Sequence, residues 1–327
     1  MATQQSEQTT ELKGDKIAII GSGQIGGSWA MLFASAGYQV ALYDVIPDRV
    51  TRTLEALLEK LHGLSRGGLL RGTLGVEEQW GRIRGVQDLG ECVTGAIWVQ
   101  ECVPEDKDIK QQVLTQVDQH CSLDTTVASS SSSLLPSDLS RNLKHKGNFL
   151  VVHPTNPPFY SRAVELVPAP WTAPETMTRA QDLMKAIGQS PITLKTEIPG
   201  FVLNRMQFAI MAESYRLVKG GFLSPDGVNK ALSAGLGRRY AFNGPFQTAH
   251  LNAEGFGSYC ERYGDMIFRV QQSFGAPEQM GGALAEHIEG EMVKEVPLDS
   301  LEKARRTREA KLAALGKLKA DLDSVKL

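Results

Sequence analysis

Short apolar runs alternate with amphipathic segments of helix length between residues 16 and 194. The runs have the length and the β-branched character of buried strands, and the longer segments repeat their apolar residues at helical spacing. Such alternation predicts a mostly parallel sheet with helices on its faces. The predicted strands are 16–20, 40–44, 96–102, 125–129, 148–153, 164–167 and 191–194, the predicted helices are 26–36, 47–61, 106–120 and 173–188, and the Gly-rich stretch 63–75 is predicted as a loop.

The pattern changes at Pro199-Gly200, beyond which we find no strand-like run. Helical periodicity dominates from there to the end of the chain. We therefore predict an α/β fold, with a Rossmann-type domain over 15–198 followed by an all-α domain over 199–327. The helices predicted in this second part are 201–220, 225–234 and 301–322.

Composition and charge exclude several functional classes. Hydrophobic residues make up 42% of the 327 residues, which is enough for a sizeable core, and a net charge of −2 offers no basic surface for nucleic acid or an anionic membrane. No apolar run approaches the about eighteen residues of a membrane span. The four cysteines lack metal-ligand spacing, so we expect reduced thiols, no metal site and a cytoplasmic location. Residues 1–14 are polar and are expected to form a flexible tail rather than a targeting peptide.

A glycine fingerprint follows the first predicted strand and opens the first helix. The sequence Gly21-Ser22-Gly23-Gln24-Ile25-Gly26 fits GxGxxG in the structural context that makes this motif specific for dinucleotides. Gly21 would permit the tight turn, Gly23 would let the backbone approach a pyrophosphate, and Gly26 would let helix and strand pack closely. The helix N-terminus would then offer free N–H groups to the phosphates.

Asp44 ends the second predicted strand, eighteen residues after Gly26. A carboxylate at this point accepts the hydroxyls of the adenosine ribose and repels a 2′-phosphate, so it favours NAD over NADP. The next residues, 45–47, supply no arginine for such a phosphate. Two alternatives remain at this level: a strand-to-helix turn without a ligand, and a flavin dinucleotide, which shares the fingerprint.

A histidine and an acid mark the candidate catalytic centre. His153 lies at the end of an apolar strand, where the ligand crevice of a parallel sheet is found, and Glu165 lies within the apolar strand 164–167. A buried carboxylate needs a partner, and His153 is the obvious one. Glu165 would then fix the tautomer of the ring and favour its cationic form. The alternative is that Glu165 caps a loop or pairs with Arg162.

These motifs, taken in order, resemble those of the 3-hydroxyacyl-CoA dehydrogenase superfamily. Within it, further segments look specifically like the lambda-crystallin/L-gulonate 3-dehydrogenase group. The superfamily resemblance is carried by 21–26, 101–106, 129–133, 153–157, 164–167 and 200–205, and the group resemblance by 29–35, 153–158 and 240–255.

The resemblance implies a catalytic group of four residues. His153 would take the proton from the C3 hydroxyl of the substrate while hydride passes to the nicotinamide, and Glu165 would orient the ring. Ser132 would hydrogen-bond the reacting oxygen, and Asn204 would hold His153 or the substrate. The serine run lacks the Asn and Thr that many relatives carry beside this serine, so either neighbouring serine remains an alternative to Ser132.

The same resemblance implies the binding residues. The backbone of Gln24 and Ile25 would face the pyrophosphate, and Glu105 and Lys110 would contact the cofactor. Arg239 would bind the carboxylate of the substrate, from the same or a neighbouring subunit; a salt bridge at the surface is the alternative for this arginine.

The expected activity is NAD-dependent oxidation of the C3 hydroxyl of L-gulonate, or of a similar small 3-hydroxy acid, by a homodimer. One alternative is a 3-hydroxyacyl-CoA dehydrogenase, which would need a groove for the CoA arm. Another, from a different class, is a structural protein of the lens, because lambda-crystallin relatives accumulate there.

Overall fold

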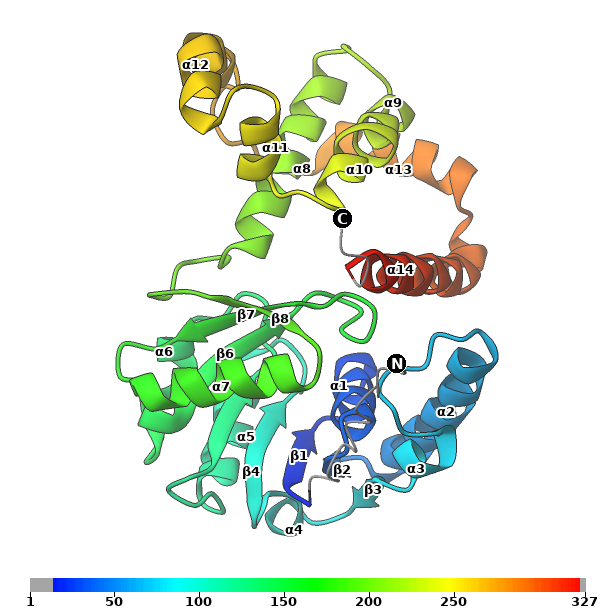
Figure 1. Ribbon diagram of the computed structural model, residues 1–327, viewed down its shortest axis with the longest axis vertical. Helices are drawn as coiled ribbons and strands as arrows, with labels where there is room; N and C mark the ends of the chain where they lie inside the picture. Colours follow the sequence, from blue (N-terminus) through cyan, green and yellow to red (C-terminus); the bar gives the residue numbers. More distant parts are fainter. Residues whose placement is uncertain (1–13, 324–327) are drawn as a thin grey trace, which may run out of the picture. The chain divides into compact units, whose positions relative to one another are not determined.

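The computed structural model describes residues 14–323. An eight-stranded sheet with the order β3-β2-β1-β4-β5-β6-β7-β8 forms the centre of the first part of the chain (Figure 1). Neighbouring strands run parallel, except that β7 runs antiparallel to β6. The strands are β1 (Lys16–Ile20), β2 (Gln39–Tyr43), β3 (Ile83–Val86), β4 (Ala96–Glu101), β5 (Thr126–Ser129), β6 (Phe149–Pro154), β7 (Ala163–Pro168) and β8 (Ser190–Thr193).

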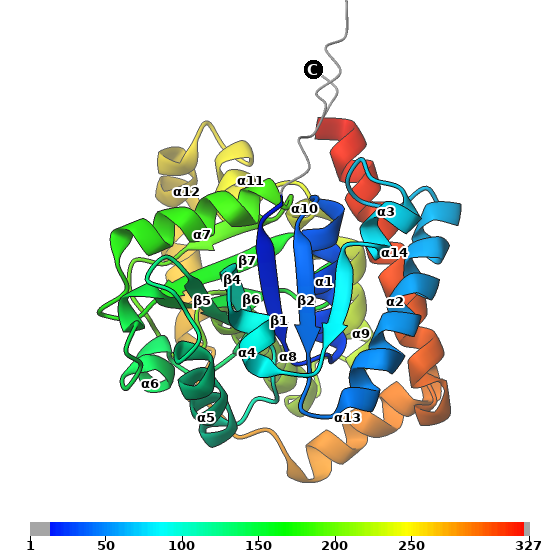
Figure 2. The ribbon, with the colours of Figure 1, turned by 90° about the horizontal axis from the view of Figure 1, so that it is seen from below.

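Helices cover both faces of the sheet (Figure 2). On one face, Trp29 and Phe33 of α1 (Gln24–Ser35) are fully buried against strand residues such as Ile19. On the other face, Leu114 packs in a second core that includes Val127. The expected Rossmann-type fold is confirmed. The first face carries α1, α2 (Pro47–Arg66) and α7 (Pro174–Ala186), and the second carries α4 (Leu89–Val93), α5 (Lys107–Asp118) and α6 (Pro136–Ser140).

Several short elements differ from the prediction. The strand β3 was not expected, because its sequence, Ile-Arg-Gly-Val, buries only its two end residues and pairs only with β2 among the described strands. The helix α2 extends beyond the predicted end at 61, through Gly63, because Leu64 is buried against the same core. This extension makes the first part of the predicted loop 63–75 wrong. The one-turn helices α3 (Val76–Trp80), α4 and α6 are too short for apolar periodicity to reveal.

The described chain forms two compact units, one of 14–204 with 312–317 and one of 205–311 with 318–323. The second unit contains no strand among its described residues, which confirms the expected helical part. The flexible tail expected over 1–14 lies outside the described residues except for residue 14. The helices after β8 are α8 (Leu203–Lys219), α9 (Pro225–Lys230), a π-helical segment (Ala231–Leu236), α10 (Gly237–Tyr240), α11 (Pro245–Leu251), α12 (Phe256–Gln272), α13 (Gly282–Glu295) and α14 (Leu301–Asp323).

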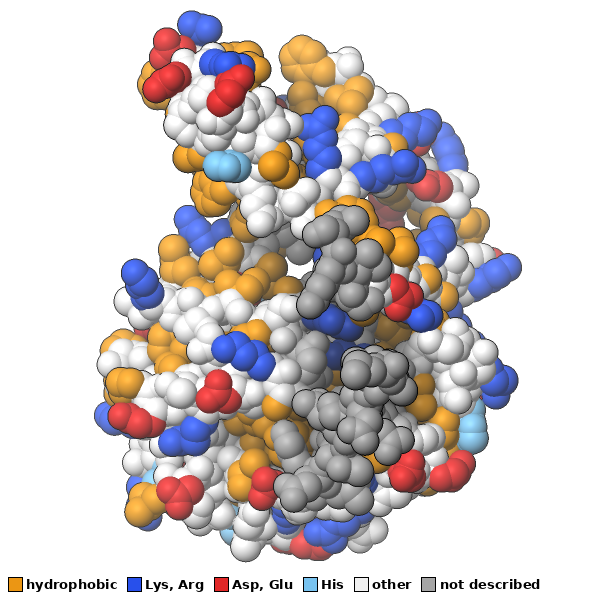
Figure 3. All heavy atoms as spheres, viewed as in Figure 1, with side chains coloured by type: hydrophobic (Ala, Val, Ile, Leu, Met, Phe, Trp, Pro, Cys, Tyr) orange, Lys and Arg blue, Asp and Glu red, His pale blue; other side chains and the backbone are white. Residues whose placement is uncertain are grey.

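Large apolar side chains of the second unit are exposed to an unusual degree. Phe222 is 77% exposed, Phe246 is 73% and Leu251 is 68%. Hydrophobic side chains, shown in orange, are visible between charged ones on the face drawn in Figure 3. A single chain therefore leaves apolar surface on this unit uncovered. Among the described helices, none combines the length and the apolar character that crossing a membrane requires.

Candidate active site

The three glycines of the fingerprint have distinct surroundings. Gly21 has a φ of 100°, and a Cβ there would lie 2.7 Å from the carbonyl oxygen of Cys102. A Cβ on Gly26 would lie 1.9 Å from the carbonyl oxygen of Gly21. A Cβ on Gly23 would meet nothing within 4 Å. The outer two glycines are therefore required by the fold, and the middle one keeps open space at the start of α1.

The N-terminus of α1 presents backbone N–H groups to that space. The helix begins at Gln24, and Gly23 before it provides no side-chain cap. The first N–H groups of a helix have no intrahelical partner, so those around Gln24 and Ile25 are suited to bind an anion. This arrangement agrees with the pyrophosphate contact expected for both residues, which stays a prediction.

Asp44 directly follows β2 and is nearly buried beside the glycine loop. Its Oδ2 accepts hydrogen bonds from the N–H (2.9 Å) and the hydroxyl (3.0 Å) of Ser22, and its Oδ1 accepts one from the N–H of Ile46 (3.1 Å). A carboxylate has about four acceptor sites, so the oxygen that faces Ile46 keeps capacity for a ribose hydroxyl. Asp44 therefore fits its predicted role while also fastening the loop.

A cavity of about 480 Å³ adjoins the glycine loop. Its lining includes Ser22, Gly23 and Gln24 and, from α2, the cations Arg49, Arg52 and Lys60. The sequence argument considered only residues 45–47 and missed these arginines, which lie farther along α2. None of the residues that line the cavity, all of them described, is acidic, so the cavity suits an anionic ligand. The other lining residues are Gly27, Ser28, Thr53, Ala56 and Leu57.

The carboxyl end of β4 carries a buried charge pair that sequence reasoning missed. Glu101 is fully buried and Lys110 nearly so, and Lys110 Nζ lies 2.9 Å from Glu101 Oε1. Glu101 also accepts hydrogen bonds from Ser129 Oγ (2.5 Å) and from the N–H of Val103 (2.6 Å). Burial raises the pKa of Glu101, and the Lys110 ammonium opposes this rise. The pair joins the ends of β4 and β5 to α5.

Glu105 holds the serine run in place. Its Oε1 accepts hydrogen bonds from the hydroxyls of Ser131 (2.7 Å), Ser132 (3.2 Å) and Ser133 (3.1 Å). The N–H groups of Ser132 and Ser133 bind the same oxygen. Partial burial would raise the pKa of Glu105, but the hydrogen bonds from the serines and the nearby Lys110 ammonium outweigh burial and lower it. Both Glu105 and Lys110 bind groups of the protein in this arrangement. Their expected contacts with a cofactor stay predictions.

His153 and Glu165 meet as the sequence suggested. They lie directly opposite each other in the antiparallel ladder of β6 and β7, and His153 Nδ1 lies 2.7 Å from Glu165 Oε2. The Glu165 side chain is fully buried, whereas that of His153 is 11% exposed. The second oxygen, Oε1, accepts hydrogen bonds from the N–H groups of Val202 (2.6 Å) and Leu203 (3.0 Å), at the start of α8. Glu165 therefore pairs with the histidine, as expected. It also caps backbone N–H groups at the start of α8, which is one of the two alternatives considered for it.

The other two predicted residues, Asn204 and Arg239, form no hydrogen bond with His153 among the described residues. Asn204 Nδ2 donates a hydrogen bond to the carbonyl oxygen of Ser132 (2.7 Å), so the structure brings these two together through backbone. Arg239 lies on α10 in the second unit and is exposed. Its contact with a substrate carboxylate stays a prediction. No cluster of three or more metal-binding side chains occurs within 14–323.

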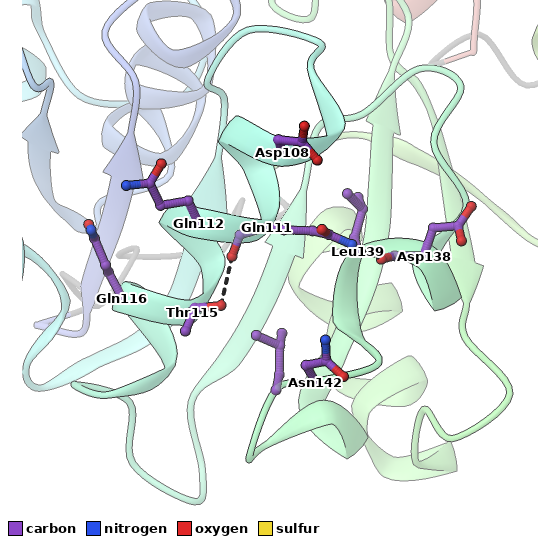
Figure 4. A pocket seen from close by; sticks show the side chains of 9 residues that line it. Asp108, Gln111, Gln112, Thr115, Gln116, Asp138, Leu139 and Asn142 are labelled. Atoms are coloured by element: carbon purple, nitrogen blue, oxygen red, sulfur yellow. Dashed lines mark hydrogen bonds between the residues drawn. The ribbon is translucent and has the colours of Figure 1, made fainter.

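A second concavity, of about 470 Å³, lies between α5 and α6 (Figure 4). Four of its nine lining residues carry amide side chains, and Thr115 Oγ1 donates a hydrogen bond to the carbonyl oxygen of Gln111 (2.7 Å). None of the site residues predicted from the sequence lines this groove, and no histidine is among its lining residues. These residues are Asp108, Gln111, Gln112, Thr115, Gln116, Asp138, Leu139, Asn142 and Leu143.

Two family models together match most of the chain. Residues 16–197 match the NAD binding domain of 3-hydroxyacyl-CoA dehydrogenase, and residues 200–287 match its C-terminal domain. The chain is 48% identical over 308 residues to a lambda-crystallin homolog of Bos taurus, covering 94% of this chain and 96% of the relative. It is 32% identical over 266 residues to the L-carnitine dehydrogenase of Oceanobacillus iheyensis, covering 80% and 85% of the two chains.

Among solved structures, the NAD+-dependent 5-formyl-3-hydroxy-2-methylpyridine 4-carboxylic acid 5-dehydrogenase is similar to this chain. The TM-score is 0.81 at 26% identity, covering 96% of this chain and 100% of that one. The NAD binding family implies NAD(H) as the cofactor. With its glycine loop, its His153–Glu165 pair and its helical second part, the chain belongs to the 3-hydroxyacyl-CoA dehydrogenase family.

Proposed function

We propose that the protein oxidises the C3 hydroxyl of L-gulonate, or of a similar small 3-hydroxy acid, with NAD+ as the hydride acceptor. The observation that carries this proposal is the buried pair of His153 and Glu165, 2.7 Å apart at the carboxyl end of β6. The substrate class comes from the resemblance of segments 29–35, 153–158 and 240–255 to the lambda-crystallin/L-gulonate 3-dehydrogenase group, and the 48% identity to a lambda-crystallin homolog supports membership of that group.

The hydrogen bonding of His153 defines its proposed role. Nδ1 donates its proton to the Glu165 carboxylate, which leaves the lone pair of Nε2 as the free acceptor. Nε2 takes the hydroxyl proton of the substrate, and Glu165 stabilises the resulting imidazolium. The cofactor supplies the hydride acceptor, and no metal takes part in this scheme. Ser132 and Asn204 complete the catalytic group that the family resemblance implies.

The proposed cofactor is NAD rather than NADP. Asp44 supports this preference, because its charge opposes a 2′-phosphate and its Oδ1 keeps acceptor capacity for a ribose hydroxyl. The glycine loop and the uncapped start of α1 support dinucleotide binding in general. Arg49 and Arg52 supply cations beside the same loop, and their charge complements that of the phosphates of the dinucleotide.

One assay decides between the candidate substrates. NADH formation is followed with L-gulonate, L-carnitine, 3-hydroxybutyrate and 3-hydroxybutyryl-CoA in parallel, and again with NADP+ in place of NAD+. We expect the highest kcat/KM with L-gulonate and NAD+, and a loss of turnover in His153→Asn. Activity that is confined to the CoA thioester would favour the acyl-CoA alternative named by the family. Activity confined to L-carnitine would favour the activity of the 32% identical relative.

A structural role is the second candidate from a different class. The 48% identical relative carries the name of a lens crystallin. Inactivity on all four substrates, together with high solubility and no NADH binding, would favour this role over catalysis.

The proposal includes a homodimer in the cytoplasm. Exposed side chains of the second unit, such as Phe222 and Phe246, offer the apolar surface that a symmetric interface needs. All four cysteines are free thiols, which supports a reducing compartment. Light scattering after size exclusion tests the dimer, and Phe246→Glu tests whether that side chain lies in the interface.

For Arg239, an unchanged KM for L-gulonate in Arg239→Ala would contradict the proposed carboxylate contact.

A further inference from the structure

The five serines 129–133 differ in where their hydroxyl protons go. The hydroxyl of Ser129 donates to Glu101 (2.5 Å), and those of Ser131, Ser132 and Ser133 all lie within hydrogen-bond distance of Glu105 Oε1. The Ser129 proton therefore goes to a carboxylate, and Ser131, Ser132 and Ser133 share one carboxylate oxygen as their nearby acceptor. Ser130 is the exception within this described run, since no carboxylate contacts its hydroxyl.

Two N–H donors occupy the acceptor side of Ser130. Trp29 Nε1 donates to Ser130 Oγ at 3.2 Å, and Gln100 Nε2 donates at 2.8 Å. The amide of Gln100 is fixed in this orientation because its Oε1 accepts from Trp98 Nε1 at 3.0 Å. Neither an indole N–H nor an amide NH₂ can accept a proton. Both lone pairs of the Ser130 hydroxyl are used, so its proton must find an acceptor elsewhere.

Within the protein, that acceptor is a weak one. Cys102 Sγ lies 3.3 Å from Ser130 Oγ, and burial raises the pKa of the Cys102 thiol to about 12, so the sulfur stays a neutral thiol. A thiol sulfur accepts hydrogen bonds poorly. An oxygen acceptor of a ligand would form a stronger hydrogen bond with the same hydroxyl. The hydrogen bonds from Trp29 and Gln100 fix the orientation of that hydroxyl.

The position of Ser130 indicates which ligand group this is. Ser130 directly follows the carboxyl end of β5, and its N–H binds the carbonyl oxygen of Glu101, the last residue of β4. Cys102 in turn binds Ile20 at the end of β1 and touches Gly21 of the fingerprint. A dinucleotide crosses the strand ends from the β2 side toward the β4 side in this fold, with its diphosphate at the glycine loop. The half beyond the loop, which is the nicotinamide, would therefore face the ends of β4 and β5.

We propose that Ser130 is a specificity-determining residue that donates a hydrogen bond to the carboxamide oxygen of the bound nicotinamide. This inference rests on the proposed use of a nicotinamide dinucleotide. It assigns to Ser130 a task separate from that of Ser132 in the catalytic group, and it gives a reason for the two N–H donors beneath the hydroxyl. A fixed carboxamide sets the rotation of the ring and therefore the face from which hydride is exchanged.

The test compares NADH with its thionicotinamide analogue, whose C=S group accepts a hydrogen bond more weakly than C=O. Dissociation constants are measured by quenching of protein fluorescence, so no substrate is needed. We expect the wild-type protein to bind NADH more tightly than the analogue. In Ser130→Ala, NADH affinity should fall about 2- to 10-fold, as for the loss of one neutral hydrogen bond, and the analogue should be affected much less. The ratio of the two constants should therefore collapse toward one.

Two further variants separate this role from a structural one. Ser130→Cys weakens the donor and should lower the ratio toward one; it is measured with a thiol reductant, because the new sulfur would lie beside Cys102 Sγ, which is 3.3 Å from Ser130 Oγ. Ser122→Ala, at an exposed serine that precedes β5, should leave the ratio unchanged. A parallel loss of affinity for both ligands in Ser130→Ala, or an unchanged ratio in Ser130→Cys, would overturn the inference. Failure of the wild-type protein to bind either ligand would overturn the proposed function as well, whereas inactivity on L-gulonate alone would not affect this result.

Discussion

Replacing Glu165 by glutamine removes a charge from the candidate active site while keeping the shape of the side chain. The carboxylate accepts at both ends, from His153 at 2.7 Å and from the N–H groups of Val202 and Leu203 at 2.6 and 3.0 Å. An amide has only one oxygen. The two backbone donors need that oxygen, so in Glu165→Gln the NH₂ group turns toward Nδ1 of His153.

The consequence for catalysis follows from the tautomer. With an NH₂ group facing it, Nδ1 must accept a hydrogen bond, so the proton of the neutral ring moves to Nε2. The nitrogen that should take the substrate proton is then blocked. We expect kcat to fall about 10²- to 10⁴-fold, the usual contribution of a general base. The free energy of unfolding should fall by about 1.5–3 kcal/mol, the range for one hydrogen bond to a charged group.

The assay combines initial rates of NADH formation, thermal unfolding and NADH binding. Binding should stay near the wild-type value, because Glu165 is placed beside the base and not at the glycine loop. Glu175→Gln, at an exposed acid in the first turn of α7, is the matched control and should change none of the three quantities. If Glu165→Gln kept kcat within about threefold of the wild type while folding normally, the reasoning from the buried pair would be refuted.

Three other predictions concern the cofactor pocket and the serine run. Gly26→Ala should lower Tm by several degrees, because its Cβ would meet the Gly21 carbonyl at 1.9 Å, whereas Gly23→Ala should keep Tm but weaken NADH binding; equal effects on Tm would contradict this division. Asp44→Ala should raise the ratio of kcat/KM for NADP+ over NAD+ by about tenfold or more, and an unchanged ratio would remove Asp44 as the selector. Glu105 has a lowered pKa when folded, so its stabilising effect is present at neutral pH and is lost as pH falls through its folded value, below the ordinary 4.5. Tm measured from pH 7 to pH 3 should therefore fall less steeply in Glu105→Gln than in the wild type.

The parts of the fold that could be predicted are those with strong apolar periodicity. The strands β1 and β6 are mostly apolar runs because both of their faces are buried, and this pattern is visible in the sequence. The edge strand β3 has only four residues and buries only the two at its ends, so it gave no such signal. In the second unit, α11 has only seven residues and α13 has weak apolar periodicity, so neither gave a clear signal, whereas α12 is amphipathic and was missed.

Some residues of the candidate site could likewise be predicted from the sequence, and others could not. The glycine loop is contiguous in sequence, and an acid inside an apolar strand demands a partner, so Gly23, His153 and Glu165 could be named in advance. The roles of Glu101 and Ser130 could not, because their partners are set by which strand ends become neighbours. Glu101 meets Ser129 only because β4 pairs with β5, twenty-eight residues farther along the chain. No local pattern encodes that proximity.

The opposition of His153 and Glu165 in an antiparallel ladder constrains how this protein can change during evolution. Side chains alternate between the faces of a sheet, so deleting one residue inside β6 or β7 would turn one member of the pair away from the other. The number of residues in the connection 155–162 is not constrained in this way, because insertions there leave the pairing of β6 with β7 in register. Length variation among descendants should therefore accumulate between the two strands after the motif 153–158, while each strand keeps its residue count.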